Sequence, residues 1–366
     1  MRALLRVVAV SVAVVLILAV VWQVVRGRDD GDASAGCASK VTDVRGIVGS
    51  EKEPFLRDPR VTEIFACAGL RMRVDPDGSR DMAARLDTGG AGYDFAFPSS
   101  TPTAEKIMEK LKVAESYRPF SSVMGVATFK PTVEVLRAAG VVQKVEGHDV
   151  VSISKLIELA RSDTTWKKLP GNAGSANPNV VLIRTTDPAD SNSAIMFVSI
   201  VSAALNDGKP VAGTGLLPRV MPDICRLMSY QGQKPDTSGV LFEEYLTGGA
   251  GRTPIALVYE SQFLDRASSQ RVPDDGEHVM LFPSPTVYAW HTLVPLSGSG
   301  DRVGQLLRDD GRLKDIAAEY GFRPQGRTLS DRPNPPVVVE PPDYRVLEAM
   351  LGQIGPFNQQ TGACDR

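Results

Sequence analysis

The sequence predicts an α/β protein built as two lobes, with the chain crossing twice between them, and preceded by one transmembrane helix. Three features predict this fold class. An uncharged apolar stretch lies near the N-terminus, strand-like and helix-like segments then alternate, and a second α/β block follows a long extended segment. The 366 residues are enough for two domains of ordinary size. A single α/β domain with irregular insertions is the alternative interpretation.

The N-terminal apolar stretch has the length of a membrane anchor. Residues 7–22 carry no charge, and Ser11 is their one polar side chain. Extended to Val25, the stretch approaches the ~20 residues that cross a hydrocarbon core. We therefore expect an uncleaved, single-pass anchor over 1–25 and a flexible tether over 26–40, which would hold the folded domain at the outer side of the cell membrane.

Two kinds of processing would change this assignment. A cleavable signal peptide usually has an apolar region of ~7–15 residues with a small-residue cleavage site soon after it. Here the candidate site at 33–35 lies well past the apolar stretch. Lipidation of Cys37 is the other alternative, but the residues before it lack the expected Leu. The anchor is the preferred interpretation.

The first block of the folded part is predicted to consist of alternating strands and helices. Gly69 closes one predicted helix, and Ser79 is a favourable N-cap for the next. Such alternation is typical of a parallel sheet covered by helices. The predicted elements are strands at 44–48, 71–74 and 93–97, and helices at 54–68, 79–86 and 104–114.

The second block begins after a long extended segment at 117–129. It is predicted to contain helices at 132–139, 152–161, 194–205, 216–231, 238–247 and 303–320, and strands at 180–185, 255–259, 279–282 and 288–296. The economical arrangement is two sheets, with crossings near 117–129 and again near 252–262. We therefore expect lobe 1 at 41–120 and 260–325, lobe 2 at 121–259, and a proline-rich connector with a C-terminal helix at 326–366.

Four cysteines, Cys37, Cys67, Cys225 and Cys364, are far apart in the sequence and have no histidine nearby. This spacing disfavours a zinc site. An exported chain can form disulfides, and four cysteines allow three pairings. We favour Cys37 with Cys67, because the helix of a βα unit returns its end to the start of its strand. Cys225 with Cys364 is then left by elimination, and buried thiols are the alternative.

Small hydroxyl residues gather in loops that join predicted strands to predicted helices. Ligands of open α/β sheets bind at the carboxyl ends of strands, and a helix start offers free N–H groups. Helix capping explains any one of these loops, but four of them would converge if the lobes face each other. The loops supply the candidate ligand-binding residues Gly49, Ser50, Ser79, Ser99, Ser100, Thr101, Ser191, Asn192 and Ser193. Nearby charges are mixed, with Glu51 and Lys52 adjacent to each other.

Other functional classes have little support in the sequence. The net charge of -2 and the absence of a long basic run argue against a nucleic-acid partner. The three histidines, His148, His278 and His291, show no metal-ligand spacing, and no nucleophile-elbow, Walker or dinucleotide-binding motif occurs. We therefore predict no metal, no cofactor and no catalytic residue. An envelope hydrolase with a scattered triad is the remaining enzymatic alternative.

Several motifs resemble bacterial extracellular solute-binding proteins of the type 2 periplasmic-binding-protein fold, and most closely a membrane-anchored actinobacterial subgroup. The resemblance covers roughly residues 42–325 and is carried by the segments Gly49-Ser50-Glu51-Lys52, Tyr93-Asp94-Phe95-Ala96-Phe97-Pro98-Ser99, Thr186-Asp187-Pro188, Ser191-Asn192-Ser193, Tyr259-Glu260-Ser261-Gln262 and Gly321-Phe322-Arg323-Pro324.

The resemblance implies a clamshell with two crossing hinge segments and a cleft between the lobes. Loops at Ser50, Ser99, Ser191 and Glu260 would line that cleft. The resemblance also adds Glu51, Glu260 and Ser261 to the candidate ligand contacts. The oxyanion binders of this fold tend to have a neutral first loop. Glu51 and Lys52 depart from that pattern, which disfavours sulfate, phosphate and molybdate.

The predicted function is capture of a small polar or ionic solute by a membrane-tethered, non-enzymatic protein, with an ABC permease as the expected partner. The alternative is a sensing or scaffolding module of the same fold at the cell envelope.

Overall fold

The structure, a computed structural model, describes residues 37–86, 92–265, 272–273 and 275–365. Within these ranges, no helix combines the length and the apolar character needed to cross a membrane. The predicted anchor over 1–25 and most of the predicted tether over 26–40 lie outside the described residues.

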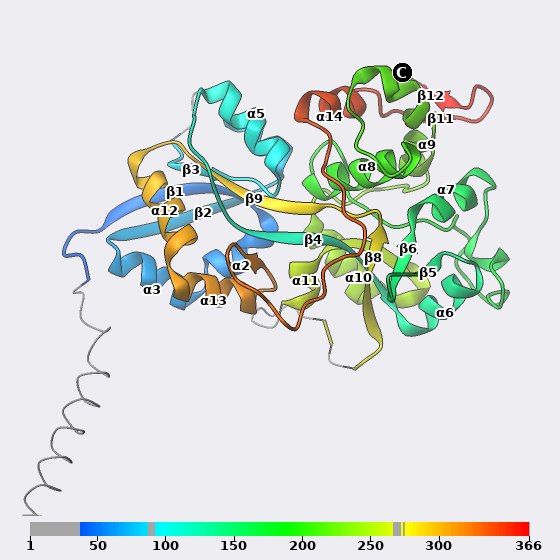
Figure 1. The fold of residues 1–366 in the computed structure, drawn as a ribbon, viewed down its shortest axis with the longest axis horizontal. Coiled ribbons are helices and arrows are strands. Elements are labelled where there is room, and N and C mark those ends of the chain that lie inside the picture. The colour runs from blue at the N-terminus through cyan, green and yellow to red at the C-terminus, as the bar shows by residue number, and fades with distance from the viewer. Residues whose placement is uncertain (1–36, 87–91, 266–271, 274, 366) are drawn as a thin grey trace, which may run out of the picture.

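Among the described residues, ten strands join into one mixed sheet that runs through the molecule (Figure 1). Its shared strand is β4, Tyr117–Phe129. The first half of β4 pairs with β9 (Tyr288–Pro295) and β10 (Arg323–Pro324), and its second half pairs with β7 (Ile255–Tyr259) and β8 (His278–Ser284). Because β4 spans 13 residues and pairs in both halves, the two sheets expected from the sequence are in fact continuous.

The first half of the sheet contains the predicted parallel βα unit, and β9 continues it antiparallel to β3. Strand β1 (Thr42–Gly49) pairs in parallel with β2 (Leu70–Asp77) and β3 (Phe95–Phe97). Successive side chains of β1 alternate between the two faces, with Val48 in one core cluster and Ile47 in another. One face is covered by α2 (Glu53–Leu56), α3 (Pro59–Cys67), α12 (Gly298–Asp309) and α13 (Gly311–Glu319), and the other by α4 (Ser79–Arg85) and α5 (Thr101–Leu111).

The second half extends the sheet with β8, β6 (His148–Ser152) and β5 (Val142–Val145). Its core cluster is the larger one and is centred on α8 (Asn192–Leu205), whose residues 192–203 are all buried. The surrounding helices are α6 (Lys130–Ala138), α7 (Ile153–Arg161), α9 (Leu217–Ser229), α10 (Ser238–Arg252) and α14 (Tyr344–Leu351). The short elements are η1 (Ser50–Lys52), η3 (Trp166–Lys168), η4 (Thr214–Leu216), α11 (Glu260–Leu264), β11 (Phe357–Asn358) and β12 (Ala363–Cys364).

Capping residues divide two of the predicted helices. The helix expected over 54–68 breaks at Asp58, whose side chain accepts the N–H of Arg60 and caps α3. The helix expected over 303–320 breaks at Asp310, which caps α13. The β5–β6 hairpin was not predicted.

The prediction of a strand at 180–185 is wrong, because these residues form no regular strand. They form only isolated bridges, at Val180 and Arg184. The buried side chain of Gln231 explains this difference, because it donates to Ile183 O (2.9 Å) and accepts from Thr185 N (3.1 Å). A side chain thus supplies the hydrogen bonds that a neighbouring strand would otherwise supply.

The division into lobes remains a prediction, and two connections bear on it. β4 passes from one half of the sheet to the other, as expected for the crossing near 117–129. After β7, α11 contacts β4 again, since Ser261 N donates to Ser122 Oγ (3.0 Å). Strand β8 lies in the range 260–325 assigned to lobe 1, yet it pairs with β6 and with the second half of β4.

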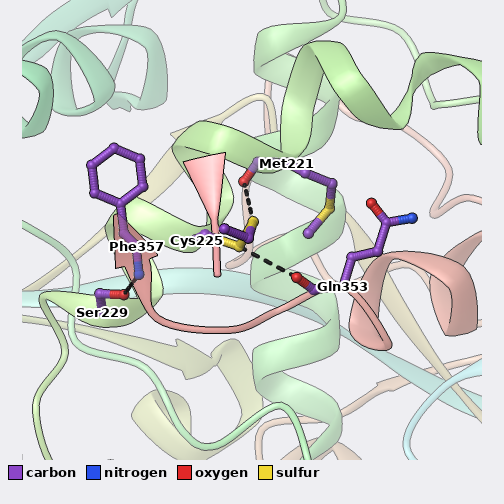
Figure 2. The surroundings of a disulfide bond; sticks show 6 residues. Met221, Cys225, Ser229, Gln353 and Phe357 are labelled. Atoms are coloured by element: carbon purple, nitrogen blue, oxygen red, sulfur yellow. Dashed lines mark hydrogen bonds between the residues drawn. A yellow bond between two sulfur atoms is a disulfide. The ribbon is translucent and has the colours of Figure 1, made fainter. Parts of the chain in front are cut away.

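Both predicted disulfides form. Cys37, which precedes β1, bonds to Cys67 at the end of α3 with Cα atoms 4.3 Å apart. Cys225 of α9 bonds to Cys364 of β12 with Cα atoms 5.7 Å apart. Figure 2 shows Phe357 and Gln353 of the C-terminal segment beside α9, where Phe357 N donates to Ser229 Oγ (2.8 Å). The C-terminal segment is therefore fastened to the second half.

Candidate functional site

A small cavity lies where loops from the two halves of the molecule meet. Its volume of about 10 Å³ is room for about one water molecule. The first half contributes Gly49, Ser50, Glu51, Asp77, Gly78, Ser79 and Ser99, and the second contributes Ser191, Asn192, Asp236, Thr237, Ser238 and Tyr259. The η1, α4, α8 and α10 helices all begin at this cavity.

Most of the predicted ligand-binding residues are brought together here. Seven of them line the cavity, namely Gly49, Ser50, Glu51, Ser79, Ser99, Ser191 and Asn192. The hydroxyl-bearing corners at Ser50, Ser99 and Ser191 therefore meet, as expected from the sequence, across one crevice.

The other five predicted residues lie beside the cavity rather than in its lining. Ser100 Oγ donates to Thr103 Oγ1 (3.2 Å), and Thr101 begins α5. Ser193 Oγ lies 2.7 Å from Thr186 Oγ1. Glu260 is 1% exposed and forms an ion pair with Arg323 (2.5 Å), and Ser261 packs against β4. Their contacts in this conformation are with the chain itself.

Several lining residues were not predicted. Asp236, Thr237 and Ser238 form the start of α10, where Thr237 Oγ1 accepts the N–H of Val240 (3.3 Å). The same signal, a hydroxyl before a helix, was present in the sequence, but no strand precedes it. His291 lies under the cavity although 239 residues separate it from Lys52. No sequence pattern indicated that contact.

The loops of the two halves touch each other directly. Asn192 Nδ2, from the start of α8, donates to the carbonyl oxygen of Ser99 (3.3 Å) and to Tyr259 Oη (3.0 Å). A Cβ atom added to Gly78 would lie 2.4 Å from the carbonyl oxygen of Asp190. The cavity is thus closed in this conformation. A solute larger than water can enter only if the loops of the two halves separate.

A buried cluster of ionisable groups lies against the cavity. The side chains of Lys52 and Glu51 are 0% and 4% exposed, and they form an ion pair. Lys52 Nζ also donates to Ser99 Oγ (3.1 Å) and lies 3.2 Å from His291 Nδ1. Ser99 Oγ donates to Glu51 Oε1 (2.5 Å), which lies 3.3 Å from His291 Nδ1. The Nζ atom also lies 5.0 Å from the ring centroid of Phe97.

Burial and mutual attraction set the charges of this cluster. Burial by itself would raise the pKa of Glu51, but Lys52 and His291 hold it well below its usual range. Burial lowers the pKa of Lys52, and the Glu51 carboxylate opposes that effect. Burial lowers the pKa of His291 to about 4, and the charge of Lys52 acts in the same direction. The cluster therefore contains a carboxylate at Glu51 and a neutral imidazole at His291, with the Lys52 side chain between burial and the attraction of Glu51.

The cluster is poorly suited to nucleophilic catalysis. A lysine beside a serine can serve as a general base only in its neutral form. Here Lys52 Nζ donates to Ser99 Oγ, and Ser99 Oγ donates its own hydrogen bond to Glu51 Oε1, so the lysine does not accept from the serine hydroxyl. In the part of the chain that the structure describes, no three metal-binding side chains lie close enough to hold an ion.

A larger hollow of about 500 Å³ is lined, among the described residues, by those of the second half alone. The loop at 231–236 lines it, and Asp236 lines both spaces. We place the candidate site at the smaller cavity, because that is where loops from both halves converge on buried polar groups. Such convergence is typical of ligand sites in α/β proteins.

The chain has the fold of periplasmic solute-binding proteins. No protein-family model and no curated protein matches it. The substrate binding protein of the ABC transporter from Agrobacterium tumefaciens has a TM-score of 0.58 at 12% identity, over 86% of this chain and 93% of that one. A periplasmic thiamin binding protein has a TM-score of 0.57 at 11% identity, over 87% and 96%. The sulfate-binding protein SubI from Mycobacterium tuberculosis H37Rv has a TM-score of 0.55 at 15% identity, over 85% and 96%.

Proposed function

We propose that this chain is an extracytoplasmic solute-binding protein that captures a small polar solute between two lobes and delivers it to an ABC-type importer. It acts without catalysis and is tethered to the cell membrane by its N-terminal helix. The observation that carries the proposal is the convergence of seven predicted loop residues, from both halves of the chain, on one closed cavity. The fold shared with transporter-associated binding proteins supports it.

The mechanism follows from the contacts across the cavity. In the closed conformation, Asn192 bridges from the start of α8 to Ser99 and Tyr259. A solute enters when the two sides separate about the connecting strands, and its own contacts then favour closure. Hydroxyl groups and free N–H groups at the helix starts provide directional polar contacts around it.

The proposal predicts that adding one methyl group at Gly78 weakens solute binding. The Cβ of Gly78→Ala would lie 2.4 Å from Asp190 O on the opposite side, so full closure would be blocked. Gly78 has φ -66° and ψ 141°, a conformation that alanine adopts readily. Overpacking costs typically about 1–3 kcal/mol, so affinity should fall by about tenfold or more.

The measurement is a thermal-shift screen of the wild type against ions, amino acids and sugars, because a bound solute stabilises the folded state. Each stabilising compound is then titrated into Gly78→Ala and into a control, Gly213→Ala. Gly213 has φ -172° and no atom within 4 Å of its added Cβ. Absence of any stabilising compound, or equal affinities of the two variants, would contradict the proposal.

A further inference from the structure

The helix starts around the cavity would ordinarily favour an anion. Helix N-termini carry partial positive charge and unpaired N–H groups. In this chain, however, three carboxylate residues line the same cavity: Glu51, Asp77 and Asp236. Each lies at or next to the start of a helix, in η1, before α4 and before α10 respectively. The described lining includes no lysine, arginine or histidine. Glu51 is paired with Lys52, and Asp77 with Arg85 (3.0 Å), so the chain's own carboxylates already engage the nearby cations where an anionic solute would bind.

Of the three carboxylates, Glu51 makes the contacts that a bound oxyanion would make. Its Oε1 accepts from Ser99 Oγ (2.5 Å), pairs with Lys52 Nζ and lies 3.3 Å from His291 Nδ1. Ser99 Oγ and Lys52 Nζ are thus already engaged and are not free to bind an incoming oxyanion. An oxyanion would therefore have to compete with a carboxylate that is covalently part of the chain and already desolvated.

Asn192 gives an independent indication of what the cavity accepts. Asn192 is 3% exposed, and its Oδ1 is buried without a hydrogen-bond partner among the described residues. The amide orientation is set by the Ser99 carbonyl, which can only accept and therefore requires the Nδ2 group. A buried acceptor without a donor is costly, so a solute that donates a hydrogen bond would be favoured.

We infer that Glu51 is the built-in counter-anion of this cleft, and that the captured solute is an amine-bearing cation whose N–H groups bind Asn192 Oδ1 and the lining carboxylates. This inference rests on the proposed function and specifies its substrate class. An ammonium group offers three donors and a positive charge, which match an acceptor-rich lining. A small oxyanion is disfavoured because Lys52 and Ser99 already bind Glu51, and because Asp236 adds a further carboxylate to the cavity lining.

The first test measures sulfate binding to the full-length chain by calorimetry, with chloride at matched ionic strength as the reference. The wild type should show no sulfate binding at millimolar concentration, whereas Glu51→Gln should bind sulfate with an affinity at least about tenfold above the detection limit of the measurement. Glu53→Gln is the matched control, because Glu53 is partly exposed, pairs with Arg57 and is absent from the described cavity lining. Sulfate binding by the wild type, or equal behaviour of the two variants, would overturn the inference. The wild-type measurement decides even if Glu51→Gln fails to fold.

The second test identifies the charge of the solute. The full-length chain is equilibrated with a mixture of polyamines, ethanolamine, amino acids, sugars, sulfate and phosphate, and retained compounds are identified by native mass spectrometry. Retention of a net cationic amine supports the inference, and Asn192→Ala should weaken its binding about fivefold or more. Retention of an anion or a neutral sugar overturns the inference but leaves the proposed function standing. If no compound is retained, the result counts against the proposed function. The sulfate measurements then still test the role of Glu51.

Discussion

At the scale of single residues, the site depends on charges that are buried together. Lys52 and His291 are both 0% exposed, and both contact the Glu51 carboxylate as well as each other. A buried charge without its partner is strongly destabilising, so these three side chains act as one unit. His291 Nε2 is buried without a hydrogen-bond partner among the described residues. The ring centroids of Phe120 and Phe322 lie 5.3 and 5.2 Å from the centroid of the imidazole. Protonation of His291 is therefore unfavourable in the folded chain.

This arrangement predicts a loss of stability on mild acidification. The pKa of His291 is lowered to about 4 in the folded chain, against 6.5 for the ordinary side chain. Between these values the unfolded state binds more protons, so stability is complete above pH 6.5 and falls as the pH decreases towards 4. The contribution is on the order of 3 kcal/mol for a fully buried group.

Urea unfolding at several pH values checks this prediction. His291→Gln removes the titrating group and should flatten the pH dependence between pH 6.5 and pH 4. The control is His148→Asn, since His148 is exposed, and it should keep the wild-type slope. If both variants lose stability with pH in the same way, His291 is not the responsible group.

At the scale of elements, the C-terminal segment is attached to the second half by several contacts. The Cys225–Cys364 disulfide joins α9 to β12, and β12 pairs with β11 (Figure 2). The α14 helix packs its buried residues Val346, Leu347 and Met350 into the core cluster that contains α8 and α9. The proline-rich segment therefore leads to an integral part of the fold.

The two disulfides should stabilise the chain to different extents. The pairs Cys225–Cys364 and Cys37–Cys67 close segments of 139 and 30 residues. In the chain-entropy description, these loops correspond to about 5 and about 3.5 kcal/mol of stability. Guanidinium unfolding of Cys225→Ala/Cys364→Ala and of Cys37→Ala/Cys67→Ala measures both. A larger loss from the second double variant would contradict this ranking and would indicate strain or residual structure.

At the scale of the whole molecule, β4 connects the two halves of the sheet (Figure 1). Its residues Tyr117–Phe129 are nearly all buried, and they pair with β9 in the first half and with β7 in the second half. A strand that belongs to both halves can transmit a bending motion while each core remains packed. The proposed capture of a solute needs only this motion and the separation of the loops.

The proposed tether predicts that the chain stays with the membrane. Full-length chain should pellet with membranes and resist extraction by high salt, because burial of about 20 apolar residues is not salt-sensitive. Intact-mass measurement should show that residues 1–25 are retained. The control is a chain that begins at residue 26, which should be released into the soluble fraction. A measured mass that corresponds to a chain beginning near residues 33–37 would instead establish cleavage.

Local sequence signals determined much of this protein. The alternation of strand-like and helix-like segments predicted β1 and β3, the loops between such segments supplied six of the cavity residues, and the βα geometry predicted the Cys37–Cys67 pair. These signals suffice because they arise from the backbone geometry of a few neighbouring residues.

Tertiary structure alone decided the rest. The contact of His291 with Lys52, the replacement of a strand partner by Gln231 and the continuity of the sheet through β4 each depend on residues far apart in the chain. The same holds for Glu51, which the sequence shows only as a charge near a loop. Its burial between Lys52, Ser99 and His291 makes it an internal anion, because the consequence of a charge is set by its solvent exposure and by its partners.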